Sequence, residues 1–160
     1  MKSLNAVRTS GIGALAGLAG GLAEIGWVIL YGAVTGAPTE PVARGVVGSL
    51  LPAFAASSWS PSLGIVIHLV LAVLLGLGLA FAFRFISSRF GAAPSEFGFA
   101  IIVLAAVWAG NFFLVLPLLN PAYVHLLPLG VTLVSKLLFG VTAAAVLRAD
   151  RAQRERKAAA

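Results

Sequence analysis

The chain has no cysteine and few charged residues. Without cysteine it cannot form disulfides, thiolate metal sites or cysteine nucleophiles. Charged residues make up 10% of the 160 positions, whereas a soluble domain has about 25%. Hydrophobic residues account for 60%, and the mean hydropathy is +1.03. This composition excludes a soluble globular domain, and the abundance of apolar residues excludes intrinsic disorder.

Four apolar stretches are long enough to cross a bilayer, which takes about 20 residues. They are continuous rather than alternating, so they predict helices and not the strands of a membrane barrel. The first is longer than the core of a signal peptide and contains Glu24, so we expect it to be retained. The predicted spans are residues 11–34, 62–83, 97–119 and 128–147.

The basic residues predict the orientation, because cytoplasmic loops carry an excess of Lys and Arg. Arg44 alone falls on one side, whereas the other side holds both terminal segments and the loop between spans two and three. Both termini are therefore predicted to be cytoplasmic, in a single membrane domain of residues 1–160. The basic residues on the cytoplasmic side are Lys2, Arg8, Arg84, Arg89, Arg148, Arg151, Arg154, Arg156 and Lys157.

The first outer loop, residues 35–61, contains apolar side chains at every fourth position. This spacing indicates an amphipathic helix in the membrane interface, or a short re-entrant segment. The predicted fold is thus an all-α integral membrane four-helix bundle with an interfacial helix in its first outer loop. The positions are Val42, Val46, Leu50 and Phe54.

The tail, residues 148–160, is predicted to be a charged helical extension. Asp150 with Arg154, and Arg151 with Glu155, have the i, i+4 spacing of helix ion pairs. Its basic residues predict attraction to anionic lipids of the bilayer. Nucleic-acid binding is not expected, because the tail is short and has no aromatic residues.

Small residues predict which helix faces pack together, because lipid provides no hydrophobic drive for helix association. On three spans the small-residue face also carries an ionisable side chain, which should therefore point into the bundle. The faces are Gly13, Gly17, Gly20 and Glu24 in span one; His68, Ala72, Gly76 and Ala80 in span two; and Thr132, Lys136, Gly140 and Ala144 in span four.

The polar residues of the spans also lie at similar depths. At about 1.5 Å per residue they are roughly 9–15 Å below the outer surface. We predict a polar cluster with a Glu24–Lys136 contact, because an isolated charge at a helix centre costs roughly 2.5–3.5 kcal/mol. The cluster comprises Glu24, His68, Asn111 and Lys136, with Thr132 and Ser135 nearby, Tyr31 two turns above Glu24, and His125 at the outer mouth.

Two functions fit this cluster. The first is a polar intramembrane pocket that binds or relays a proton, a cation or a small polar solute. The second is an accessory or structural subunit of a larger membrane complex, in which Glu24 and Lys136 fix the helix register. An inward-facing cluster with an outer opening favours the pocket, and a sealed pair favours the subunit. A homodimer is a further possibility, and the glycine face of span one is a candidate interface for it.

No enzyme signature is present, and no cofactor or metal is expected. The G-x-S-x-G pattern of serine hydrolases is absent. His68 and His125 differ in predicted depth, which disfavours a haem held by both. A zinc site needs three or four ligands, and Glu24 with the two histidines would supply them at unmatched depths.

The pattern resembles small four-span bacterial inner-membrane proteins such as the YagU-like group. The resemblance rests on the glycine- and alanine-rich first span (Gly13 to Gly21), on His68 early in span two, and on Pro117 near the outer end of span three. Lys136 has no counterpart in that pattern. The resemblance implies a location in the bacterial inner membrane and no particular activity.

Overall fold

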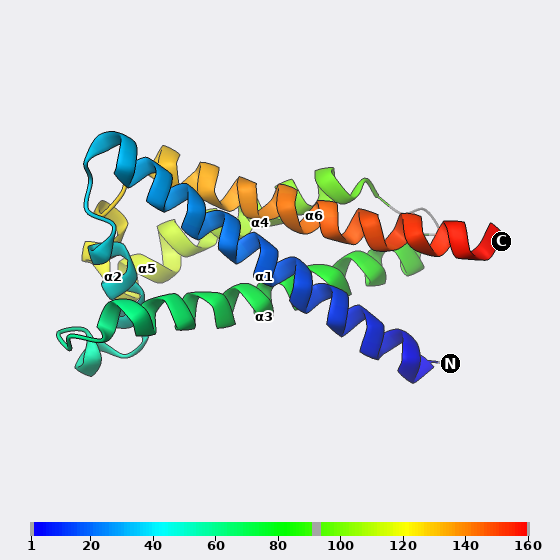
Figure 1. Ribbon diagram of the computed structural model, residues 1–160, viewed down its shortest axis with the longest axis horizontal. Coiled ribbons are helices and arrows are strands. Elements are labelled where there is room, and N and C mark those ends of the chain that lie inside the picture. The colour runs from blue at the N-terminus through cyan, green and yellow to red at the C-terminus, as the bar shows by residue number, and fades with distance from the viewer. Residues whose placement is uncertain (1, 91–93, 160) are drawn as a thin grey trace.

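The structure, a computed structural model, describes residues 2–90 and 94–159, with side chains from residue 6 onward. The part described is helical, without strands. Four segments are long and apolar enough to cross a membrane, as the sequence predicts. They are built from α1 (Lys2–Thr35), α3 (Ser60–Phe90), α4 (Glu96–Gly110) with its continuations η2 (Asn111–Val115) and α5 (Leu116–Leu119), and α6 (Leu129–Ala159) (Figure 1).

Local sequence signals explain where the helices begin and end. Pro61 occupies the first turn of α3, where its missing N–H costs nothing. The Ser95 hydroxyl accepts the Gly98 N–H and so caps α4. Gly36, with φ of 74°, ends α1 in the left-handed conformation that favours glycine, and its N–H donates to the Gly32 carbonyl. These residues fix the ends of three of the long helices.

Three short elements lie together at the end of the bundle opposite the N and C termini (Figure 1). They are α2 (Glu40–Leu50), η1 (Pro52–Phe54) and η3 (Pro121–His125). We call this the loop end, and the opposite end the terminal end. Both termini lie at the terminal end, which agrees with an even number of spans.

The helix predicted in the first loop is present as α2 and packs against α3. It ends at Leu50, and Phe54 lies beyond Pro52 in η1, where its ring packs 5.6 Å from that of Trp59. Ala43 lies directly on Gly64, where a Cβ would collide with the Ala43 carbonyl. Helix α2 therefore packs on α3 through Ala43, whereas Leu50 and Phe54 of the predicted stripe are exposed, and its position in a membrane interface stays a prediction.

The predicted small-residue faces of α1 and α3 pack against each other. A Cβ on Gly17 would collide with the backbone of Ala72, and one on Gly76 with the backbone of Gly17. Gly20 faces the ring of Phe139 from α6 at a similarly close distance. These glycines are required by close helix approach, and the face is thus occupied within one chain. It is not free to form the homodimer interface considered above.

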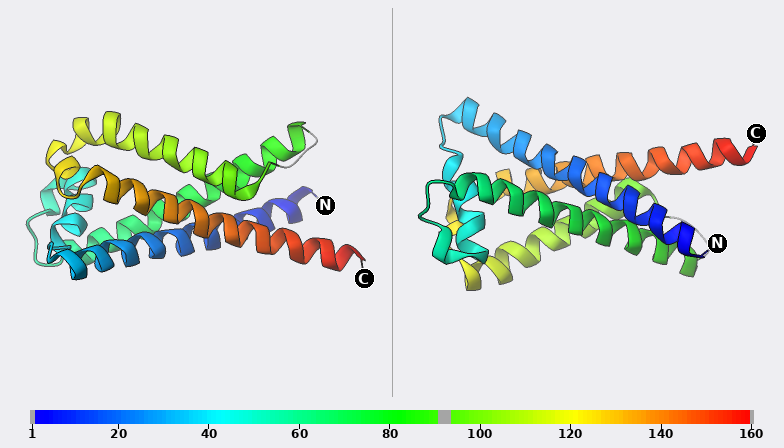
Figure 2. Two further views of the ribbon diagram at one scale, coloured as in Figure 1. Left: turned by 90° about the horizontal axis from the view of Figure 1, so that it is seen from above. Right: turned by 60° about the horizontal axis from the view of Figure 1, so that its bottom comes forward.

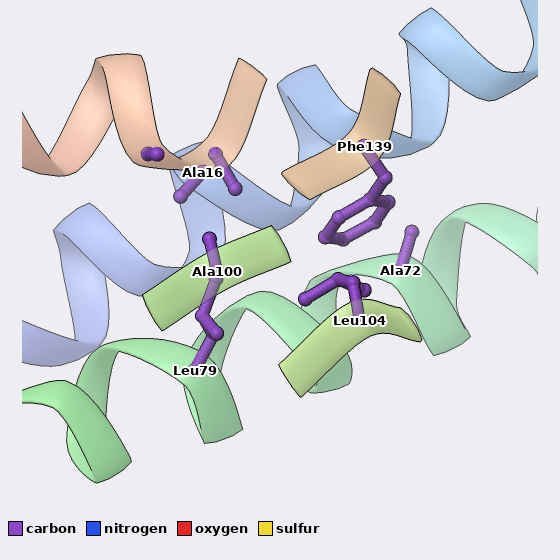
Figure 3. Close-up of a cluster of buried hydrophobic side chains, with 8 residues drawn as sticks. Ala16, Ala72, Leu79, Ala100, Leu104 and Phe139 are labelled. Atoms are coloured by element: carbon purple, nitrogen blue, oxygen red, sulfur yellow. The ribbon is translucent and has the colours of Figure 1, made fainter. Parts of the chain in front are cut away.

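A buried apolar cluster lies where the four long helices come together (Figure 3). From this region toward the loop end, α1 and α4 move apart (Figure 2). The helices α3 and α4 make few contacts with each other, whereas α1 packs on both α3 and α6. The cluster consists of Ala16, Ala72, Leu79, Ala100, Leu104, Phe139, Ala143 and Ala144.

Ion pairs hold the helices together at the terminal end. Asp150 accepts from Arg8 of α1 at 2.6 Å and from Arg154 at 2.8 Å. Arg151 contacts Glu96 of α4 at 2.8 Å and Glu155 at 3.1 Å. The two predicted i, i+4 pairs are confirmed, and each also extends to a neighbouring helix. Much of the charge of the tail is therefore balanced within the chain.

Candidate functional site

Glu24 and Lys136 form an ion pair between α1 and α6. The Lys136 Nζ lies 2.7 Å from the Glu24 Oε1, which confirms the predicted contact. The Glu24 side chain is 6% exposed and that of Lys136 is 19% exposed. One turn deeper, Gly20 lets α1 approach Phe139, and the Lys136 Nζ lies 5.4 Å from the centre of the same ring. Close helix packing therefore positions the pair.

His68 joins the pair from α3. Its Nε2 lies 3.6 Å from the Glu24 Oε2 and 3.3 Å from the Gly21 carbonyl oxygen. When Nε2 carries the proton, it donates to that carbonyl and faces the carboxylate. Three titratable groups from three helices thus meet, as the small-residue faces predict. The His68 side chain is 27% exposed, which is more than either partner.

The three groups border a cleft of about 620 Å³, within the size range of ligand pockets. On α1 and α6, Glu24 and Lys136 are the lining residues farthest from the loop end. Beyond them lies the buried apolar cluster, which includes Phe139. Most of the lining is apolar: Ile25, Val28, Ile29, Val42, Ala43, Val46, Leu50, Pro61, Gly64, Ile65, Leu71, Ala72, Leu75, Val107, Phe112, Val115, Leu116, Leu119, Leu126 and Leu127.

The other predicted cluster residues on α4 and α6 also line the cleft. Ser135 is buried there, and Asn111 is half-buried. The Thr132 hydroxyl already makes two hydrogen bonds: it donates to the Leu129 carbonyl and accepts the Trp108 Nε1–H at 3.0 Å. Within the described residues, the side-chain amide of Asn111 has no hydrogen bond. None of these side chains hydrogen-bonds to the Glu24–Lys136 pair in the part of the chain described.

Asn111 also begins the π-helical turn of span three. Turns of this kind are rare and frequently occur at functional sites. Pro117 follows shortly and cannot donate a backbone hydrogen bond, which disturbs regular α-helical pairing at this point. The irregular turn presents Asn111 and Phe112 to the cleft.

Two predicted site residues lie elsewhere. Neither Tyr31 nor His125 lines the cleft, and His125 is exposed in η3. Tyr123, which was not among the predicted site residues, lines it instead. Burial, with a smaller contribution from the negative charge of Glu24, raises the pKa of Tyr123 to about 12. Pro121 and Pro128 interrupt regular helix at the two ends of this segment, but helical periodicity does not predict where Tyr123 lies.

Helix α2 forms a wall of the cleft at the loop end. The Asn120 amide donates to the Gly45 carbonyl and to the Ser49 hydroxyl, both at 3.2 Å. The Tyr123 ring packs on Gly45 so closely that no Cβ would fit there. Arg44 pairs with Glu40 and donates to the Ser57 carbonyl at 2.8 Å. The wall is thus fixed to α5, to η3 and to the loop before α3.

Electrostatically, the inner end of the cleft is nearly balanced. The carboxylate of Glu24 is matched by the ammonium of Lys136, and the imidazole of His68 lies beside the carboxylate. The Lys136 ammonium is better exposed than Glu24 and has donors beyond the one that the carboxylate occupies. The arrangement suits recognition of a polar group that enters the cleft.

No protein-family model, curated protein or solved structure matches this chain. The resemblance to the YagU-like group therefore stays a prediction.

Proposed function

We propose that the protein is a non-enzymatic, polytopic membrane protein whose intramembrane cleft binds a small solute. The observation that carries this proposal is the meeting of Glu24, His68 and Lys136 at the inner end of a cleft. Ionisable groups inside a membrane are costly and mark functional sites. The positive-inside pattern supports a loop end that faces away from the cytoplasm, in a bacterial inner membrane.

Binding accounts for the geometry better than conduction across the membrane does. The apolar cluster lies directly beyond the pair, and Ala16, Leu104 and Phe139 in it are fully buried. A proton or ion leaving Glu24 toward the terminal end would meet these side chains, which offer no hydrogen-bond partner. A relay therefore extends only from the cleft to Glu24, through His68.

The alternative is an accessory subunit in which the pair only fixes helix register. Buried ion pairs serve this purpose in some proteins, and the near-complete burial of Glu24 fits it. The partial exposure of His68 and Lys136 to a cleft favours binding. The two functions differ in whether water and solutes reach the cluster.

Cysteine accessibility tests this difference, because the natural chain has no cysteine and needs no background removed. The variants Asn111→Cys and Ser135→Cys would be treated in membranes with a small, membrane-impermeant thiosulfonate. Binding predicts modification of both from the extracytoplasmic side, more slowly at the more buried Ser135→Cys. Ala143→Cys, placed in the fully buried apolar cluster, is the control and should not react.

A cleft that is sealed and dry would leave all three variants unmodified. That result would overturn the proposed function and favour the register-fixing subunit. Modification from the cytoplasmic side alone would contradict the proposed orientation.

A further inference from the structure

The cleft has two chemically different regions. Its walls are mostly apolar side chains of α1, α2, α3 and the α4–α5 segment, and Glu24, His68 and Lys136 meet away from the loop end. A small, fully polar solute would leave most of the apolar wall unmatched. A molecule with an apolar chain and one polar head would match both regions, because apolar surface gains from apolar contact.

The polar head should be a hydrogen-bond acceptor with a negative charge. Lys136 and His68 are the more exposed members of the cluster, and Glu24 lies behind them. An ammonium has three donors, of which Glu24 occupies one. A cationic head would meet Lys136 and be repelled.

The charge count favours a monoanion. The charges of Lys136 and Glu24 cancel, so the cluster has no surplus of positive charge to balance a doubly charged head. Of the other titratable groups that face the cleft, Glu40 is paired with Arg44 at 2.8 Å. Tyr123 stays neutral at physiological pH and contributes a hydroxyl. A carboxylate fits this balance better than a doubly charged phosphate.

The apolar chain has a route from the bilayer. The helices α3 and α4 make few contacts with each other, although residues of both line the cleft. Exposed apolar residues border it on the two sides, Ile65 and Leu71 on α3 and Val115 and Leu119 on the α4–α5 segment. Polar lining is sparse at this opening, which suits entry from lipid.

From these observations we infer that the ligand is a single-chain amphiphilic carboxylate. Its carboxylate would contact the Lys136 ammonium, and its chain would lie between α3 and α4. The inference rests on the proposed function, because it names the class of solute that the cleft binds. It commits to an amphiphile from the bilayer and not to the helix of a partner protein.

Photolabelling tests the inference with the full chain in phosphatidylcholine vesicles. The probe is a dodecanoate with a diazirine near the end of its chain, and adducts are mapped by mass spectrometry. We expect saturable adducts on residues bordering the opening, such as Leu71 and Val115. Unlabelled dodecanoate should compete about tenfold better than dodecanol or dodecylammonium, because only the carboxylate gains a charge-assisted bond.

Variants of Glu24 and Lys136 test whether binding of dodecanoate depends on the cluster. Glu24→Gln frees Lys136 of its carboxylate partner and should bind dodecanoate at least as well as the natural chain. The double variant Glu24→Gln/Lys136→Met removes the ammonium without changing the net charge of the cluster, and it should lose about tenfold or more in competition. Lys157→Met removes one positive charge from the exposed tail and should change nothing.

Different results would contradict different parts of the proposal. Equal competition by the alcohol or the ammonium would overturn the carboxylate assignment and leave binding in the cleft intact. Adducts that are not saturable, or that are spread over the outer helix faces, would overturn the inference itself. Cysteine accessibility tests the proposed function separately. If Asn111→Cys and Ser135→Cys react but dodecanoate does not bind in the cleft, the proposed function stands and only the assigned class of ligand is wrong.

Discussion

Glu24 on α1 and Lys136 on α6 are 112 positions apart in the chain, taken as 136 minus 24, and their side chains lie 2.7 Å apart within the bundle. Removing either partner leaves a buried charge without compensation. We expect Glu24→Gln and Lys136→Met each to lower the free energy of unfolding by about 3–5 kcal/mol. The double variant should recover most of this loss, as measured by denaturant titration in mixed micelles.

Glu155→Gln is the control for that series. Glu155 belongs to an exposed ion pair, so this substitution should change the free energy of unfolding by less than about 1 kcal/mol. If the double variant folds normally and also binds solute as the natural chain does, the pair only fixes helix register. The pocket would then have no function that depends on it.

The close approach of α1 and α3 makes Gly17 intolerant of a side chain. A Cβ there would collide with the backbone of Ala72, so Gly17→Ala should destabilise the protein by about 1–3 kcal/mol. Gly26→Ala on the same helix has open space around it and should be neutral or slightly stabilising. Thermal unfolding of the two variants checks this, and equal losses would contradict the packing.

Tyr123 should titrate at unusually high pH. Burial and the charge of Glu24 raise its pKa from the ordinary 10.0 to about 12. The difference in phenolate absorbance between the natural chain and Tyr123→Phe measures this titration. Glu24→Gln should lower the midpoint, although only in part, because burial is the larger cause.

The same shift has a consequence for stability. The unfolded chain ionises Tyr123 near pH 10, whereas the folded chain ionises it near pH 12. The contribution of Tyr123 is therefore complete below about pH 10 and is lost as pH rises toward 12. A Tyr123→Phe variant with the same loss of stability over this range would contradict the assignment.

The Ser60 hydroxyl is expected to destabilise the folded protein. This hydroxyl is fully buried and, within the described part of the chain, has no hydrogen-bond partner. Ser60→Ala removes an unsatisfied polar atom and should raise the free energy of unfolding by about 1 kcal/mol. Ser88→Ala, which removes an exposed hydroxyl, is the control and should have little effect. A destabilised Ser60→Ala variant would reveal a partner for this hydroxyl.

The sequence was sufficient to predict the spans and the central contact. Long apolar stretches admit few alternatives in a bilayer, and the glycine spacing of α1 and α3 identified the faces that pack. Because Glu24, His68 and Lys136 continue those faces, their convergence could be deduced without coordinates.

The parts outside the regular spans were harder to predict. Tyr123 reaches the cleft through the irregular fold of η3, and helical periodicity does not report on such a turn. The stripe of α2 has the same spacing whether it faces lipid headgroups or a neighbouring helix. Tyr31 was predicted from its position above Glu24, but α1 moves away from α4 toward the loop end, and Tyr31 does not line the cleft.

The most direct test is a solid-state NMR measurement of the distance between the Lys Nζ and Glu Cδ atoms. The chain would be labelled with ¹⁵N-lysine and ¹³C-glutamate in bilayers. In the described part of the chain, the Glu24–Lys136 contact is the only Lys–Glu pair. The account predicts a strong dipolar coupling in the natural chain that disappears in Glu24→Gln. A natural chain without this coupling would contradict the convergence on which the site depends.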